Sequence, residues 1–365
     1  SATPSTESFY AAQNGRTQLV RLTKRYGGNP LPSVQIVDMR AELAAGNPRE
    51  ISLALEDAIR RNLEAEKQTI LLLNRRGYQT MAQCEDCREV LMCHYCGSQQ
   101  EPPPTLCPAC GGKLLYRGFG TQKAEEELAK LFPEARVLRM DQDSTAAKDA
   151  HEKLLAKFAA HEYDIMVGTQ MVAKGLDFEN VTLVGVISAD LSLYVDDYRA
   201  GERTFSLLTQ VVGRAGRGAK QGRAVIQTFT PENDVIRCAA RQDYDSFYEQ
   251  EIELRRMRLC PPFRELFVLT ASGPLESAVL RTCMRLRRSL EGWLAQPPFR
   301  DWELTVLGPA PASVAKINDR YRYRLTLAAQ NTKEIRAMVA HLVRCAQTDK
   351  ENKGVSVSAD VNPLD

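Results

Sequence analysis

The sequence predicts an α/β protein in which a doubly wound parallel sheet is interrupted by a cysteine-rich module and followed by a smaller α+β domain. Between residues 68 and 229, short apolar runs alternate with segments of helical periodicity. Parallel sheets with helices on both faces are built from this order. Residues 264–361 read as strand, helix, strand, strand, helix, strand, the order of a split βαββαβ unit. Six of the ten cysteines form three CxxC pairs, which lie between Cys84 and Cys110 within the first of these two regions.

The first 45 residues are predicted to be mostly irregular, with strand candidates near 18–22 and 34–37, and are assigned to the end of a preceding lobe and a linker. A helix is then expected, with Asn47 as N-cap, Pro48 at the first helical position and Glu50 completing a capping box. Its apolar stripe has helical spacing: Ile51, Leu55, Ala58, Ile59 and Leu63. The run TILLLN at 69–74 predicts a strand buried on both faces.

The remaining elements follow in alternation. Thr121 is expected to cap a helix that ends near Leu131, and further helices are expected at 145–160 and 200–213. Strands are expected at 136–140, 163–169, 181–189 and 223–229. A charged helix reaching Met257 begins the C-terminal domain, which ends in the ferredoxin-like βαββαβ unit. We therefore assign 46–80 and 118–233 to the sheet, 81–117 to the cysteine module and 234–365 to the C-terminal domain.

Composition restricts where the protein works and what it binds. The formal net charge is +2 over 365 residues, so a nucleic-acid surface must be a local patch. The first residues lack the apolar core of a signal peptide, and no run reaches the ~18 apolar residues of a membrane span. The cysteines are typical of a reducing compartment, so we expect a cytoplasmic protein with no membrane contact.

The three CxxC pairs are Cys84–Cys87, Cys93–Cys96 and Cys107–Cys110. Two thiolates at this spacing bind one Zn²⁺ from a tight turn, and four thiolates complete a tetrahedral structural site. A thioredoxin-like redox pair is the weaker alternative, because the three pairs lie together in a proline-rich, polar segment. The remaining four cysteines are interpreted as ordinary core or surface thiols.

The segment QVVGRAGRG carries the strongest indication of catalysis. If it is helical, Gln210, Arg214 and Arg217 share one face. Two guanidinium groups there can stabilise the charge that develops on a transferred phosphoryl group. Gly213, Gly216 and Gly218 would permit close backbone approach. The alternative is a solvated basic helix end.

At these residues the sequence resembles superfamily 2 helicases. QVVGRAGR resembles motif VI, VGTQMVAKGLDF at 167–178 motif V, LLLNRRGY at 71–78 motif IV and SATPS at 1–5 motif III. MDQDST at 140–145 matches a further strand-end motif. With the cysteine module, LRRMRLCPPF and LGPAPASVAKINDRYRYRL, nearly the whole chain resembles the primosomal protein N′ (PriA) family of replication-restart helicases.

The resemblance implies that the sheet is the second RecA-like lobe of an ATP-dependent 3′→5′ DNA helicase that acts at stalled forks and helps load the replicative helicase. It implies ATP and Mg²⁺ as cofactors. The implied partners are forked and single-stranded DNA, the single-strand DNA-binding protein and primosome or helicase-loader proteins. A bacterial, nucleoid-associated location would follow.

Site residues follow from the motifs. Gly168 and Thr169 should lie at the carboxyl edge of the sheet, where ligands bind in open α/β folds. The implied catalytic set is Gln210, Arg214 and Arg217. The implied ATP-binding or coupling set is Thr3, Gly175 and Asp177. The implied DNA-binding set in this lobe is Arg75, Arg76, Thr169, Gln170 and Lys174. A surface ion pair is the alternative for Lys174 and Asp177.

In the C-terminal domain, basic residues alternate with tyrosines, and we expect Lys316, Arg320 and Arg322 to bind DNA. Strand alternation puts Arg320, Arg322 and Arg324 on one face and Tyr321, Tyr323 and Leu325 on the other. An amphipathic strand with its tyrosines in the core is an equally good interpretation.

The resemblance also implies a zinc arrangement. The family has four CxxC pairs and pairs the first with the last and the second with the third. Carried over, one complete site is formed by Cys84, Cys87, Cys107 and Cys110. Cys93 and Cys96 then make half a site. The chain would bind one Zn²⁺, or two if residues are missing from the sequence between Cys93 and Cys96.

Two features of the first motor lobe have no match in the sequence: a GxxxxGK[ST] phosphate loop and a strand-end pair of acids preceding motif III. We therefore expect no ATP hydrolysis by this chain alone. A zinc-bearing DNA and protein adaptor without motor activity is the alternative function, and motifs V and VI count against it. The cysteine module disfavours another branch-processing helicase.

Overall fold

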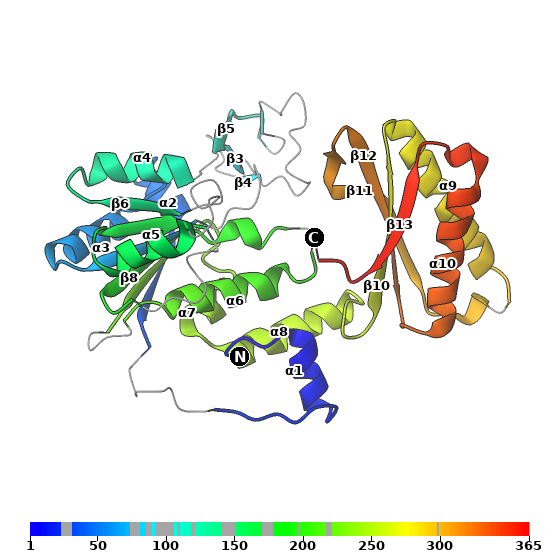
Figure 1. The fold of residues 1–365 in the computed structure, drawn as a ribbon, viewed down its shortest axis with the longest axis horizontal. Coiled ribbons are helices and arrows are strands. Elements are labelled where there is room, and N and C mark those ends of the chain that lie inside the picture. The colour runs from blue at the N-terminus through cyan, green and yellow to red at the C-terminus, as the bar shows by residue number, and fades with distance from the viewer. Residues whose placement is uncertain are drawn as a thin grey trace.

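The computed structural model describes residues 1–22, 31–73, 81–84, 90–91, 106–107, 110–117, 121–140, 150–169, 178–195, 197–216, 221–297 and 299–364. These residues form a large sheet unit and a smaller C-terminal unit, with helix α8 (Tyr244–Met257) reaching from one toward the other beside α1 (Thr6–Gln13) (Figure 1). Among the described helices, none has the length and apolar character needed to cross a membrane.

The large sheet has six parallel strands in the order β1-β9-β8-β2-β7-β6. Their bounds are β1 Ser33–Asp38, β2 Gln68–Leu73, β6 Val137–Met140, β7 Ile165–Gly168, β8 Val181–Ser188 and β9 Arg223–Thr228. Every residue of β2 is buried, as the continuous apolar run predicts. The predicted doubly wound parallel sheet is confirmed.

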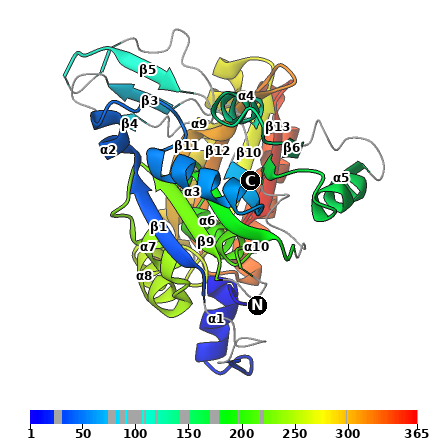
Figure 2. The ribbon, with the colours of Figure 1, turned by 90° about the vertical axis from the view of Figure 1, so that its left-hand side faces the viewer.

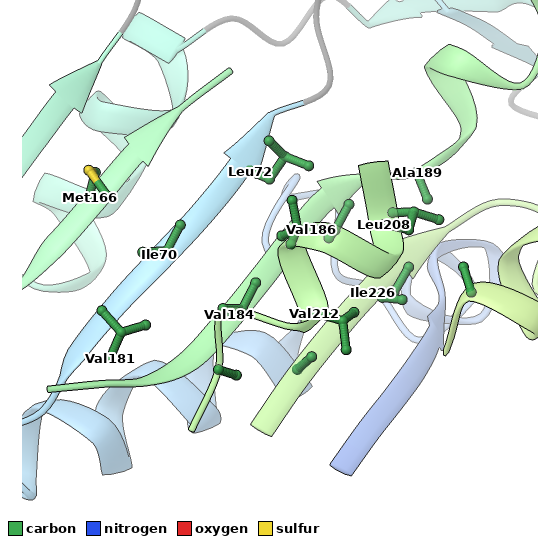
Figure 3. Packing of buried hydrophobic residues seen from close by; sticks show 14 of the residues in the cluster. Ile70, Leu72, Met166, Val181, Val184, Val186, Ala189, Leu208, Val212 and Ile226 are labelled. Atoms are coloured by element: carbon green, nitrogen blue, oxygen red, sulfur yellow. The ribbon is translucent and has the colours of Figure 1, made fainter. Parts of the chain in front are cut away.

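Two hydrophobic clusters cover the two faces of this sheet. Ile70 and Leu72 point into one cluster, under α6 (Ala200–Val212), α7 (Asp234–Arg241) and α5 (Ala150–Ala159) (Figure 3). Leu71 and Leu73 point into the other, under α2 (Met39–Ala44), α3 (Leu53–Glu64) and α4 (Thr121–Leu131). The alternation of β2 side chains between two cores explains why the strand carries no polar face.

The N-terminal assignment was wrong in two respects. Residues 18–22 form no strand, and the first 45 residues contain the helices α1 and α2. Strand β1, which we placed in a linker, pairs with β9 and forms one edge of the large sheet. Its partner lies almost two hundred residues away in sequence, so local pattern could not reveal this pairing.

The expected cap at Asn47 was also wrong, because α3 starts at Leu53. Ser52 is the N-cap, and its hydroxyl accepts a hydrogen bond from the Leu55 amide at 3.1 Å. Asn47 instead closes the preceding turn, accepting from the Arg49 amide and donating to the Ile51 carbonyl. The turn is fixed to the sheet by the buried Gln227, which accepts from the Ser52 amide at 2.8 Å.

Helices α7 and α8 pack with the sheet unit rather than with the C-terminal domain. Ile236, Cys238 and Phe247 belong to the same core as the sheet and α6. The C-terminal core begins only at β10 (Glu265–Gly273), with Phe267. The independent C-terminal core therefore starts about 30 residues later than the boundary that we drew at residue 234.

The C-terminal sheet is antiparallel, in the order β11-β12-β10-β13. Its strands are β10, β11 Thr305–Ile317, β12 Arg320–Ala329 and β13 Ser356–Val361. The helices α9 (Glu276–Leu294) and α10 (Lys333–Thr348) cover one face (Figures 1 and 2). This strand order confirms the predicted βαββαβ ferredoxin-like domain.

A third, three-stranded antiparallel sheet lies within the cysteine-rich insertion. Its order is β4-β3-β5, formed by Val90–Leu91, Met81–Cys84 and Leu114–Arg117. The insertion leaves the large sheet after β2 and returns before α4, so the sheet order around it is undisturbed.

Candidate functional site

Three adjacent strands of the large sheet end together at one edge. β2, β7 and β6 end at Leu73, Gly168 and Met140, and the Thr169 amide donates to the Met140 carbonyl at 3.4 Å. The sequence motifs at 71–78, 167–178 and 140–145 start on these strand ends. The predicted placement of Gly168 and Thr169 at the carboxyl edge is confirmed, and Thr169 is half-buried there.

Many predicted site residues lie outside the described part of the chain, so their roles stay predictions. They are Arg75, Arg76, Cys87, Cys93, Cys96, Gln170, Lys174, Gly175, Asp177 and Arg217. Cys84 is placed as the last residue of β3, but only its backbone is described.

Two predicted residues from opposite ends of the motif order meet on helix α6. The hydroxyls of Thr3 and Ser206 are 2.9 Å apart, and the Gln210 amide donates to the same Ser206 hydroxyl at 2.9 Å. Ser206 therefore bridges Thr3 and Gln210. Sequence reasoning missed Ser206, although its position four residues before Gln210, on the same helical face, was the available signal.

The end of α6 differs from our expectation. The helix ends at Val212, and Arg214 lies half-buried in the following turn, so the prediction that Arg214 continues the same helical face as Gln210 was wrong; Arg217 lies outside the described residues. A backbone contact imposes the turn. Gly216 has φ of +69°, and a Cβ added to it would lie 2.0 Å from the Gly222 nitrogen. Close backbone approach is therefore confirmed for Gly216.

A buried arginine ties this region to the rest of the molecule. Arg255 on α8 is 1% exposed and binds carboxylates from three separate segments. Its guanidinium lies 3.0 Å from Glu7 on α1, 2.8 Å from Glu202 on α6 and 2.7 Å from Glu251 on α8 itself. We call these four residues the Arg255 cluster.

The electrostatics of the Arg255 cluster reflect its burial. Desolvation raises the pKa of Glu251 above its ordinary value, although Arg255 opposes this. Burial also raises the pKa of Tyr198, whose ring lies 5.0 Å from the Arg255 guanidinium. Glu202 also accepts from the Thr6 amide at 3.1 Å, so the cluster holds the N-terminal segment against the start of α6.

Sequence reasoning missed the whole Arg255 cluster. The spacing of Glu251 and Arg255 is that of an ordinary i, i+4 surface pair on a charged helix. Arg255 lies within LRRMRLCPPF, quoted above for its resemblance, but nothing in that segment marks the side chain as buried. Only the fold, which brings Glu7 and Glu202 to it, distinguishes Arg255 from its exposed neighbour Arg256.

In the C-terminal domain the predicted strand alternation is confirmed. Tyr321, Tyr323 and Leu325 pack against the core beneath α9 and α10. Tyr323 donates to Glu276, and burial together with this carboxylate raises its pKa to about 12. Both tyrosines are partly buried against this core, which agrees with the alternative interpretation, and a role in stacking stays a prediction.

The three basic residues predicted to bind DNA are half-buried or exposed and bonded locally. Lys316 pairs with Asp319 at 3.1 Å, and Arg320 donates to the Ser272 carbonyl at 2.8 Å. The Arg322 guanidinium lies 3.5 Å from the Val314 carbonyl. Each of these contacts either lies at the surface or uses only some of the N–H groups of the side chain. The three side chains therefore retain N–H donors for phosphate oxygens.

In the described part of the cysteine module, hydrogen bonds join Cys107 to the residues that follow Cys110. The Cys107 amide donates to the Gly112 carbonyl, the Gly111 amide donates to the Cys107 carbonyl, and the Gly112 amide lies 3.4 Å from the Cys110 sulfur. Gly111 has φ of +76°, which favours glycine. An amide directed at the sulfur favours a thiolate ligand. Among the described residues no group of three or more potential metal ligands is assembled.

The other cysteines are as expected: Cys238, Cys260 and Cys283 are buried, and Cys345 is exposed on α10. Burial raises the pKa of Cys283 to about 11, so this thiol stays protonated at neutral pH.

Comparison with known proteins identifies two domain families in the chain. A model described as the primosomal protein N C-terminal domain matches residues 256–364. A model described as the helicase conserved C-terminal domain matches residues 109–219. The first match starts near the end of α8, in agreement with a C-terminal core that begins at β10.

Curated relatives match over most or all of the chain. The replication restart protein PriA of Bacillus subtilis is 40% identical and covers 100% of this chain and 47% of its own length. The PriA proteins of Synechocystis and Chlamydia trachomatis are 40% and 33% identical, over 89% and 100% of this chain and 42% and 50% of their own lengths. The chain thus spans about half the length of these relatives.

Solved structures give weaker likenesses. RecG bound to a three-way DNA junction covers 70% of this chain and 26% of its own, at 13% identity and a TM-score of 0.42. Yeast Dbp5 bound to RNA and ADP BeF3 covers 70% of this chain and 53% of its own, at 11% identity and a TM-score of 0.35. The fold assignment therefore rests on strand order and on the family matches.

The raised pKa of Glu251 predicts a specific pH dependence. A carboxyl whose pKa is raised in the folded state adds stability that is fully present below its unfolded pKa, near 4.5, and is lost as pH rises through its folded pKa. Relative to Glu251→Gln, the wild type should therefore lose stability as pH rises from about 4 toward neutral. Urea unfolding across this range measures the difference. The exposed Glu253→Gln is the matched control, and a flat or rising difference would contradict the assignment.

Proposed function

We propose that this chain, which belongs to the PriA family of replication restart proteins, supplies the second motor lobe and the DNA-binding C-terminal domain of an ATP-dependent 3′→5′ DNA helicase. The observation that carries the proposal is the contact of Thr3, Ser206 and Gln210. It joins the segment resembling motif III to the helix resembling motif VI, in a sheet whose motif-bearing strands end at one edge.

The chemistry asked of this chain is electrostatic. Phosphoryl transfer needs positioning and charge stabilisation more than covalent participation by the protein. Arg214, in the turn after α6, and Arg217 would donate to the phosphoryl oxygens as charge accumulates there. ATP and Mg²⁺ would be held mainly by the other motor lobe, with Gly175 and Asp177 contributing from this one.

Gln210 would connect that event to the N-terminal segment. It shares the Ser206 hydroxyl with Thr3, so a change in the position of Gln210 alters the hydrogen bond that holds Thr3. Thr169, beside the strand end of β6, and the DNA-binding residues named for this lobe would donate to backbone phosphates. Such contacts hold DNA without reading its sequence, as a translocating motor requires.

The C-terminal domain would hold the branch. Lys316, Arg320 and Arg322 come from adjacent strands, β11 and β12. They offer charge for DNA phosphates, and the net charge of +2 confines this role to such a patch. Forked DNA, the single-strand DNA-binding protein and helicase-loader proteins, in the bacterial nucleoid, are the partners that we propose.

We also propose one structural Zn²⁺, bound by Cys84, Cys87, Cys107 and Cys110. The hydrogen bonds among Cys107, Cys110, Gly111 and Gly112 fit a pair of thiolates, and the pairing of β3 with β5 brings the end of β3 near the segment that follows Gly112. When bound, Zn²⁺ would stabilise this small insertion. The alignment with the Bacillus subtilis relative spans 382 positions against 365 residues here, so that relative has residues with no counterpart in this chain. A fourth CxxC pair would be among them.

The motor role predicts a separation of activities. In a protein that joins this chain to an ATP-binding lobe, Arg214→Ala with Arg217→Ala should lower DNA-stimulated ATP hydrolysis by roughly 10³-fold or more. Fork affinity should stay nearly unchanged. The exposed Arg237→Ala is the matched control. ATP hydrolysis and unwinding that survive the double substitution would contradict the role given to the two arginines, whereas a loss of restart activity only through partner binding would favour the adaptor.

The zinc proposal predicts a stoichiometry. Native mass spectrometry of the 365-residue chain should show one zinc per chain, lost in Cys107→Ser and retained in Cys345→Ser, because Cys345 is an exposed thiol on α10. A chain that folds with no zinc would contradict the proposal. So would one that keeps its zinc after Cys107→Ser.

A further inference from the structure

The Arg255 cluster lies where three parts of the chain meet. Glu7 comes from the N-terminal segment, Glu202 from the start of α6, and Arg255 with Glu251 from α8. Arg255 also lies 3.4 Å from the Pro261 carbonyl, in the connection that leads from α8 into β10. One guanidinium is thus in contact with the N-terminal segment, the α6 helix and the connection to the C-terminal domain.

From Glu202, a line of polar contacts runs along one face of α6. Glu202, Ser206 and Gln210 follow each other at intervals of four residues, so they share one face of the helix. The N-terminal segment lies along this face, with the Thr6 amide on Glu202 and the Thr3 hydroxyl on Ser206. A displacement of Glu202 therefore affects the N-terminal segment that carries Thr3, and through the Thr3–Ser206 contact it affects the hydroxyl to which Gln210 donates.

The C-terminal domain does not pack completely against the sheet unit. A cleft of about 560 Å³ lies between the two units, lined on one side by Tyr198, Arg258 and Cys260 and on the other by strands β10, β11 and β12. Beside it, Arg199, the residue before α6, lies 3.2 Å from the Pro363 carbonyl. Polar links next to an open cleft can adjust when the domain moves, unlike a dry packed interface.

A purely stabilising role would not require this arrangement. Apolar side chains of similar volume often stabilise a protein as well as a buried ion pair does. The guanidinium differs from an apolar side chain in that its interactions are directional. Its planar N–H donors hold carboxylates at fixed angles. Glu7 also lies 3.9 Å from Arg199, so the three carboxylates are shared between two arginines, and their spacing depends on the position of α8.

We propose that Arg255 is a positioning residue that transmits the placement of the C-terminal domain to the α6 helix and so to Gln210 and the turn bearing Arg214. The proposal rests on the proposed function, because it takes forked DNA as the ligand that moves the C-terminal domain. Binding of a fork to that domain shifts α8, Arg255 carries the shift to Glu202, and α6 changes its contact with the N-terminal segment.

Hydrogen–deuterium exchange with and without a synthetic fork tests this in the intact chain. In the wild type, fork binding should change the exchange rates of the α6 and α1 amides by roughly threefold or more, since local opening reports the stability of those contacts. The change should be lost in Arg255→Met and partly restored in Arg255→Lys. Arg256→Met, an exposed neighbour on the same helix, should behave as the wild type.

A second variant covers the case in which Arg255→Met does not fold. Glu202→Gln keeps the volume and an oxygen acceptor for the Thr6 amide but removes the charge that Arg255 binds. It should bind the fork with unchanged affinity and lose the exchange change in α6 and α1. Retention of the wild-type exchange response in a folded Glu202→Gln or Arg255→Met chain would overturn the proposal.

Fork affinity, measured in the same samples, separates the two levels of inference. A wild-type chain that binds no fork would overturn the proposed function and this inference with it. A wild-type chain that binds the fork without any exchange change in α6 would overturn only the role of Arg255.

Discussion

The buried charge of Arg255 is the constraint on which the arrangement of this molecule depends. Burying an unpaired guanidinium costs far more than a typical net stability can offset, so carboxylates must surround it. Those carboxylates come from α1, α6 and α8. The chain can therefore bury this side chain in only one arrangement of three segments. These are the N-terminal segment, the α6 helix and the helix that leads to the C-terminal domain.

The arrangement of these three segments also decides where the N-terminal segment meets the α6 helix. The parallel sheet brings the ends of β2, β7 and β6 together through its strand order. The sheet alone, however, does not place Thr3 beside Gln210. The N-terminal segment reaches Gln210 because Glu202 holds the Thr6 amide at the start of α6, and Ser206 bridges the last step. The position of α6, in which the segment resembling motif VI begins, thus depends on both a packed core and a charged cluster.

Much of the fold was predictable because the spacing of apolar residues along the chain indicates which side chains are buried. The apolar run of β2 predicted two covered faces, and the alternation in β12 predicted which face would carry its arginines. Pairings over long separations were not predictable. β1 pairs with β9 because the edge of the sheet offers backbone groups for hydrogen bonding. No local sequence pattern shows which strand will occupy that edge. Ser52 and Asn47 are both good caps, and the contact of Gln227 with the Ser52 amide favours the former.

The candidate site likewise has a part that the sequence predicted and a part that it did not. Thr3 and Gln210 were predicted from motifs, and the structure brings them together through a serine that motif reasoning passed over. The helical spacing of Gln210 and Arg214 failed because Gly216 must approach Gly222, which ends α6 at Val212. Arg255 was missed because burial is a property of the fold, and its sequence spacing matches that of a surface pair.

The measurement that tests the central claim most directly is a double-mutant cycle between Arg255 and Glu202. Unfolding free energies would be determined for the wild type, Arg255→Met, Glu202→Gln and the double variant. If Arg255 and Glu202 hold the segments together, the two substitutions should couple by about 1–3 kcal/mol. Effects that add to within about 0.5 kcal/mol would show that the two side chains act independently and would contradict the account.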